Sequence, residues 1–203
     1  PTLVDKVKQR RNLPSAWSMD EISRIVAAAR VQTQPQKGMV FPAYVWWPAL
    51  ILTAFDTGLR LGSLLEIRRD DWVESRRELT VSALYMKHRI AQTFIVSEQT
   101  AAAINRMLNE PHKPPEEPPQ QLFQWPCGKD QVWVHMRAIV QRAGLYQAGK
   151  NNLFHKIRRT TATQLTAAVG IEAACRQLGH SSTEMTRRYV DPRHTGQHNA
   201  SQH

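Results

Sequence analysis

Cysteine is scarce in this sequence: Cys127 and Cys175 are the only two among 203 residues, and no CxxC pair or neighbouring histidine cluster accompanies them. A disulfide framework or a zinc site needs more closely spaced ligands, so neither is expected. Long apolar runs are also missing, since none approaches the roughly 18 residues that span a membrane. The N-terminus lacks the layout of a signal peptide. These absences predict a cytoplasmic protein with no membrane partner.

Acidic residues are few relative to basic ones: the sequence has 17 aspartates and glutamates and 27 lysines and arginines, which gives a net charge of +10. The excess is +4 in residues 1–50, 0 in 51–110, +2 in 111–150 and +4 in 151–203. Since no polybasic tail holds this charge, the pattern indicates a folded basic face. Such a face suits a polyanion, either nucleic acid or an acidic membrane surface. Charge that serves only solubility is the alternative.

Internal repeats are absent too, and the length with 41% hydrophobic residues suits one domain. We interpret residues 1–14 as a linker or remnant, 15–191 as the folded domain and 192–203 as a disordered tail. The chain begins at Pro1 instead of methionine, so one interpretation is an excised fragment whose partner domain is missing.

Helical patterns dominate the chain. A Ser-x-x-Glu capping box at Ser18 and Glu21 begins a helix that we expect to end near residue 30. An apolar run predicts a buried central helix at 43–55, with a break near Gly58. Further helices are expected at residues 61–67, 97–108, 130–143, 155–169, 171–178 and 182–189, with Gly170 and Gly179 at helix ends.

One stretch alternates between apolar and polar residues. It predicts a β-hairpin with strands near residues 79–83 and 94–96 and a basic tip at Lys87-His88-Arg89. The proline-rich segment 112–119 is expected to be an extended surface loop. The predicted fold class is therefore α+β: mainly α with a small antiparallel β-sheet.

Three short motifs carry candidate chemistry. Arg60 follows a glycine break, where a guanidinium can project from a rigid corner; pairing with Asp56 or Glu66 is the alternative. His155 and Arg158 lie three positions apart and share one face of a predicted helix, where they could meet one ligand. A solvated basic face is the alternative there. The motifs are Thr57-Gly58-Leu59-Arg60, His155-Lys156-Ile157-Arg158, and Leu178-Gly179-His180 with Tyr189 nine positions later.

The third motif joins a histidine and a tyrosine. His180 follows a glycine at a predicted helix start, where backbone N–H groups and the helix dipole favour an anion. A capping or core histidine is the alternative. Tyr189 follows Arg187 and Arg188, and a surface tyrosine is its ordinary explanation.

Taken together and in order, these residues resemble the tyrosine recombinase, or phage integrase, family over about residues 15–191. That family has an arginine in a Thr-Gly-Leu-Arg-like turn, a hairpin lysine, His-x-x-Arg, Leu-Gly-His and a tyrosine nine positions beyond that histidine. The matching residues are Arg60, Lys87, His155, Arg158, His180 and Tyr189. The resemblance implies the DNA breaking-rejoining catalytic domain of a site-specific recombinase (integrase), which cuts and rejoins DNA through a 3′-phosphotyrosine on Tyr189.

The resemblance also implies a role for each residue. Arg60 and Arg158 stabilise the charge that develops on the phosphate. His155 accepts the proton of the nucleophile, which is otherwise weak at neutral pH. Lys87 protonates the departing 5′ oxygen, with a contact to the DNA backbone as its alternative. His180 donates a hydrogen bond to the scissile phosphate.

No cofactor is implied, neither metal nor ATP, because the arginines neutralise charge and the phosphotyrosyl link keeps the bond energy. The implied partners are double-stranded DNA recombination sites, held in pairs by a homotetramer, with a monomer in the absence of DNA and a bacterial or phage origin. Two rivals stay open. A type IB topoisomerase typically has lysine where His155 stands, and a catalytically silent DNA-binding module could use the same basic face.

Overall fold

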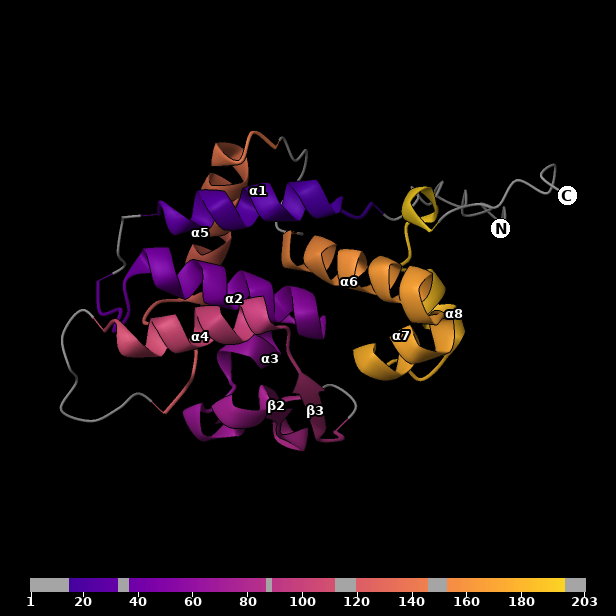
Figure 1. The fold of residues 1–203 in the computed structure, drawn as a ribbon, viewed down its shortest axis with the longest axis horizontal. Coiled ribbons are helices and arrows are strands. Elements are labelled where there is room, and N and C mark those ends of the chain that lie inside the picture. Colours follow the sequence, from indigo (N-terminus) through magenta and orange to yellow (C-terminus); the bar gives the residue numbers. More distant parts are fainter. Residues whose placement is uncertain (1–14, 33–36, 87–88, 112–119, 146–152, 196–203) are drawn as a thin grey trace, which may run out of the picture.

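The computed structural model describes residues 15–32, 37–86, 89–111, 120–145 and 153–195 (Figure 1). Lys87 at the expected hairpin tip, the proline-rich segment 112–119 and residues 1–14 and 196–203 lie outside the described residues. The helices are α1 (Met19–Arg30), α2 (Ala43–Thr57), α3 (Leu61–Leu65), α4 (Glu98–Asn109), α5 (Lys129–Arg142), α6 (Leu153–Val169), α7 (Ile171–Leu178) and α8 (Thr183–Arg187).

Helix α2 is the centre of the core. It packs against α1, α4 and α6, and Figure 1 shows α1, α2 and α4 stacked side by side with α6, α7 and α8 gathered at one end. Trp46, Trp47 and Leu50 on α2 are 0–1% exposed. A helix that is apolar on most faces must be buried on most sides, which confirms the prediction of a central helix.

A small sheet lies beside the helices. Its strands β1 (Trp72–Val73), β2 (Glu78–Val81) and β3 (Gln92–Ile95) are antiparallel in the order β1-β2-β3. Leu79 pairs with Phe94 and both are buried, whereas Thr80 is exposed. The predicted hairpin is thus confirmed. The two-residue strand β1 was not predicted, because it is too short to produce an alternating pattern.

Several predicted helix boundaries are confirmed. The Ser18–Glu21 capping box forms at the start of α1, and α7 ends at Gly179 in the left-handed conformation. Helix α8 is shorter than predicted: it ends at Arg187, so Tyr189 lies two residues beyond it.

The predicted disordered tail is wrong for its first residues. Asp191 is fully buried, and Pro192–His194 form a 3-10 turn (η4) that packs on α6. The polar composition of this segment suggested disorder, but Asp191, directly before it, is fixed by two long-range hydrogen bonds. Its carboxylate accepts the backbone N–H of Ala16, and its own backbone N–H donates to Oγ1 of Thr163.

Over the described ranges, none of the helices combines the length and the apolar character needed to cross a bilayer. The same ranges contain no group of three His, Cys, Asp or Glu side chains arranged to hold a metal ion. Cys127 and Cys175 are free thiols.

Candidate active site

The end of α2 places Arg60 at the entrance to α3. Gly58 ends α2 in the left-handed conformation, with φ +65°, which favours glycine. A Cβ atom at Gly58 would lie 2.5 Å from Cδ2 of Leu178, so the close packing of α2 against the end of α7 also needs glycine here. Arg60 follows as the N-terminal flanking residue of α3. In the described part of the chain Arg60 forms no ion pair, and Asp56 instead accepts the backbone N–H of Ser97.

Arg158 on α6 joins the ends of two other helices. It is 3% exposed. Its Nη1 group donates to the carbonyl oxygen of Gly58, and Nη2 donates to the carbonyl oxygen of Leu178 at 2.8 Å. Burial, reinforced by the charge of Arg60, lowers the pKa of Arg158 to about 10. The guanidinium therefore remains protonated at neutral pH, and it connects the Thr-Gly-Leu-Arg turn with the Leu-Gly-His motif.

The contacts of His180 fix its tautomer. Nη2 of Arg158 lies 2.9 Å from Nε2 of His180, and Oγ1 of Thr186 lies 3.0 Å from Nδ1. A guanidinium has no acceptor, so Nε2 must accept and Nδ1 must carry the proton that it donates to Thr186. The expected donation from His180 to a phosphate would require Thr186 to reverse its role or His180 to take a second proton.

Tyr189 lies over this pair. Its ring centroid is 4.9 Å from that of His180 and 5.5 Å from Cζ of Arg158, which is within cation–π range. The described residues thus bring Arg158, His180 and Tyr189 into mutual contact. In this arrangement the tyrosine ring helps to cover the guanidinium.

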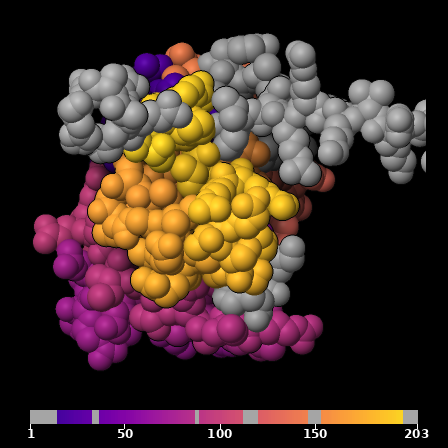
Figure 2. Space-filling view, turned by 90° about the vertical axis from the view of Figure 1, so that its right-hand side faces the viewer, coloured from indigo at the N-terminus to yellow at the C-terminus, as the bar shows by residue number. Residues whose placement is uncertain are grey.

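An open cavity of about 560 Å³ adjoins the cluster. Arg60 and His180 line it from the helical side, while Gln92 lines it from β3. Gln92 also donates to the carbonyl oxygen of Gln177 at 2.9 Å, which ties the sheet to α7. Figure 2 shows this end of the molecule, where C-terminal residues in orange and yellow meet magenta residues of the sheet region.

His155 lies one turn before Arg158 on α6 and is half-buried. Burial and the charges of Arg60 and Arg158 lower the pKa of His155. The neutral imidazole is therefore favoured at neutral pH, as a proton acceptor requires. Within the described ranges, His155 makes no hydrogen bond or ring contact with Tyr189.

The site contains groups that the motifs did not indicate. Thr186 orients His180, and the carbonyl groups of Gly58 and Leu178 orient Arg158. The spacing of six residues between His180 and Thr186 was available in the sequence, but a threonine on a short helix is too common to stand out.

The chain belongs to the phage integrase family, because the family profile, described as "Phage integrase family", matches residues 17–195. No curated protein sequence matches the chain significantly.

Solved structures share the fold. XerA recombinase is 20% identical with a TM-score of 0.71, covering 91% of this chain and 61% of its own. A lambda integrase dimer bound to a COC′ core site is 19% identical with a TM-score of 0.68, covering 96% and 53%. The catalytic domain of bacteriophage HP1 integrase is 19% identical with a TM-score of 0.62, covering 88% and 87%. The chain therefore spans less than two thirds of the XerA and lambda integrase chains.

Proposed function

We propose that this chain is the catalytic domain of a site-specific DNA recombinase that uses Tyr189 as its nucleophile. The observation that carries the proposal is the contact cluster of Arg158, His180 and Tyr189, with Arg60 beside it. A protonated, buried guanidinium next to a tyrosine is suited to hold a phosphodiester against the tyrosine hydroxyl. We assign this activity to residues 15–191.

In the proposed reaction, the Tyr189 oxygen attacks phosphorus and its proton passes to His155. The lowered pKa of His155 keeps its imidazole neutral and able to accept that proton. The bond between phosphorus and the 5′ oxygen breaks, and Lys87 supplies the proton to that oxygen. Arg60 and Arg158 stabilise the charge on the non-bridging oxygens. A 5′ hydroxyl from another strand then attacks the 3′-phosphotyrosine and restores both the phosphodiester and the tyrosine.

Substrate entry requires a local rearrangement. Because Arg158 is almost fully buried and Tyr189 lies over it, the phosphate must displace the ring from the guanidinium. As Arg158 turns one N–H toward the phosphate, Nε2 of His180 loses its donor. His180 can then donate from Nε2 to the same phosphate once Thr186 donates to Nδ1 or the ring takes a second proton.

The partners follow from the same proposal. The net charge of +10 favours double-stranded DNA. Lambda integrase has been solved as a dimer on a core site and as a tetramer on a Holliday junction, and we infer a homotetramer on paired recombination sites here, with a monomer in the absence of DNA. The protein acts without metal or ATP, in the cytoplasm of a bacterial host.

A covalent-trapping experiment tests the function. The protein is incubated in EDTA with nicked suicide duplexes of varied sequence, and a denaturing gel reports the protein–DNA adduct. We expect an adduct that Tyr189→Phe abolishes and that Tyr85→Phe, the matched change in a half-buried tyrosine of η3 (Ala83–Tyr85), leaves intact. Binding without an adduct would instead support the silent DNA-binding module, and relaxation of supercoiled plasmid without strand exchange would support the topoisomerase.

A further inference from the structure

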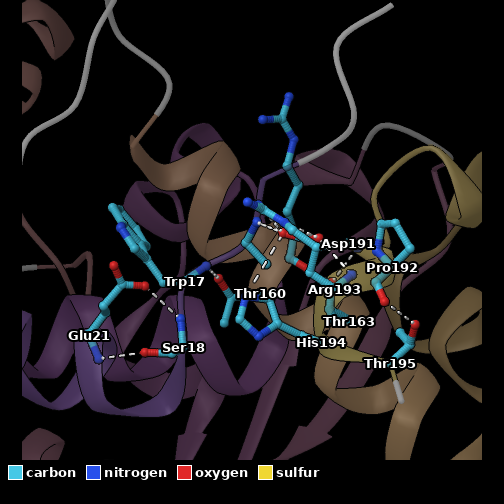
Figure 3. Close-up of polar contacts among 12 residues, drawn as sticks. Trp17, Ser18, Glu21, Thr160, Thr163, Asp191, Pro192, Arg193, His194 and Thr195 are labelled. Atoms are coloured by element: carbon cyan, nitrogen blue, oxygen red, sulfur yellow. Dashed lines mark hydrogen bonds and ion pairs between the residues drawn. The ribbon is translucent and has the colours of Figure 1, made fainter. Parts of the chain in front are cut away.

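The chain that follows Tyr189 is fixed at Asp191 to two elements that are distant in the sequence (Figure 3). The backbone N–H of Asp191 donates to Oγ1 of Thr163 on α6 at 2.9 Å. Its carboxylate oxygen Oδ2 accepts the backbone N–H of Ala16, just before α1, at 2.9 Å. Asp191 is 0% exposed, so these contacts lie inside the protein.

Arg193 compensates the charge of the buried carboxylate. Its backbone N–H and Nε donate to Oδ1 of Asp191 at 3.1 and 2.9 Å, and Nη2 donates to Oδ2 at 2.6 Å. These bonds, together with the one from Ala16, hold the pKa of Asp191 well below its ordinary value of 3.8. A buried carboxylate is costly unless it is paired, and here both of its oxygens accept hydrogen bonds.

Two threonines one turn apart on α6 hold the start of the first helix region, at Trp17, and the segment after Tyr189, at Asp191. Thr163 accepts from Asp191, while Thr160 accepts the backbone N–H of Trp17 at 2.9 Å. The same helix carries His155 and Arg158. Helix α6 is therefore the common frame for the proton acceptor, the phosphate-binding arginine and the segment that follows the nucleophile.

Helix α8 cannot hold Tyr189 by itself. It has five residues, and isolated helices of this length are unstable in water. Among the described residues, the backbone N–H groups of Tyr189 and Val190 both donate to the carbonyl oxygen of Thr186, at 2.8 and 3.3 Å, so these bonds tie the segment only to the end of α8 itself. The next contact with another part of the fold is made by Asp191, two residues after Tyr189.

We propose that Asp191 is a positioning residue for the nucleophile: by bonding to Thr163 and Ala16, it fixes the backbone that carries Tyr189 over Arg158. This inference rests on the proposed function. A displacement of about 1 Å in a reacting group can slow a reaction by roughly 100-fold, so loosening this anchor should slow cleavage without weakening DNA binding.

Four variants test the proposal. Thr163→Val keeps the shape of the side chain but leaves the N–H of Asp191 without an acceptor, and Thr163→Ser keeps the hydroxyl. Asp191→Asn places an amide N–H₂ against N–H donors. Thr160→Val is the matched control, because it removes the same type of contact one turn away, from a segment that does not carry Tyr189.

Each variant is measured for urea unfolding, for DNA affinity by gel shift and for the rate of adduct formation on the nicked duplexes. We expect Thr163→Val and Asp191→Asn to form the adduct about 10- to 100-fold more slowly, with DNA affinity within about threefold of wild type. Thr163→Ser should restore the rate. Thr160→Val should lower stability as Thr163→Val does, yet cleave at the wild-type rate.

Other results would overturn the proposal in distinguishable ways. Wild-type rates in either folded variant, or an equal loss in Thr160→Val, would show that the anchor does not position Tyr189 while leaving the proposed function standing. If neither Thr163→Val nor Asp191→Asn folds, Asp191 serves folding and the positioning role is refuted. Failure of the wild-type protein to form any adduct would remove the proposed function, and this inference with it.

Discussion

Replacing Arg158 with lysine separates the charge of this residue from its geometry. Arg158 donates hydrogen bonds to two carbonyl groups and to His180, whereas a lysine ammonium on a different stem should keep about one of the three. Buried partners left without a bond cost roughly 1–3 kcal/mol each. With two bonds lost, and a cost in the lower part of that range because the backbone can adjust, we expect Arg158→Lys to lower the free energy of unfolding by about 2–4 kcal/mol.

Two assays measure this effect. Urea unfolding should show a midpoint lowered by about 1–2 M, given a typical dependence of 1–3 kcal/mol per M. The rate of adduct formation should fall on the order of 100- to 1000-fold, because a point charge replaces a planar group with several directed donors. The cleavage rates should be compared at one ionic strength, since DNA affinity depends on salt.

Arg159→Lys is the control, because this neighbouring side chain is half-buried and makes no hydrogen bond or ion pair within the described ranges. It should unfold and cleave as the wild type does. A wild-type urea midpoint for Arg158→Lys would refute the structural part of the reasoning, and a wild-type cleavage rate would refute the need for a guanidinium at the phosphate.

The pKa of His155 lies below 6.5 because of burial and nearby arginines, and the proposed acceptor is the neutral form. The second-order rate constant of adduct formation should therefore be constant near pH 7 and decline only as the pH falls below 6.5, and a midpoint above 6.5 would contradict this role. Gly58→Ala should destabilise the fold by about 1–3 kcal/mol, because φ is +65° and the new Cβ meets Leu178. Gly62→Ala, with no atom nearer than 3.7 Å to the new Cβ and a helical backbone, should keep or raise stability by up to about 1 kcal/mol in the same unfolding assay.

Much of the fold could be predicted from local patterns. The capping box of α1, the apolar run of α2 and the alternation around Leu79 each reflect interactions within a few residues. Local patterns could not predict β1, which is too short, or the end of α8 at Arg187. Both depend on contacts with other elements.

The motifs indicated candidate residues for the site but not their arrangement. The spacing of His155 and Arg158 indicates a shared helix face, but only the packing of α7 against α6, and of α8 against α7, decides that Arg158 is buried and His155 only half-buried. The role of Asp191 could not be predicted, because its partner Ala16 lies 175 positions earlier. No local pattern reports a contact of that separation.

The two fixed points around Tyr189, the proposed nucleophile, limit how far it can move. Thr186 is held by His180 and Asp191 by Thr163, which leaves only residues 187–190 between them. So short a segment allows little displacement of the Tyr189 backbone. The tyrosine hydroxyl can therefore move mainly by rotation of the Tyr189 side chain. In the proposed reaction, docking of the duplex brings the scissile phosphate to within a side chain's reach of Tyr189 and so decides which bond in the DNA is cut.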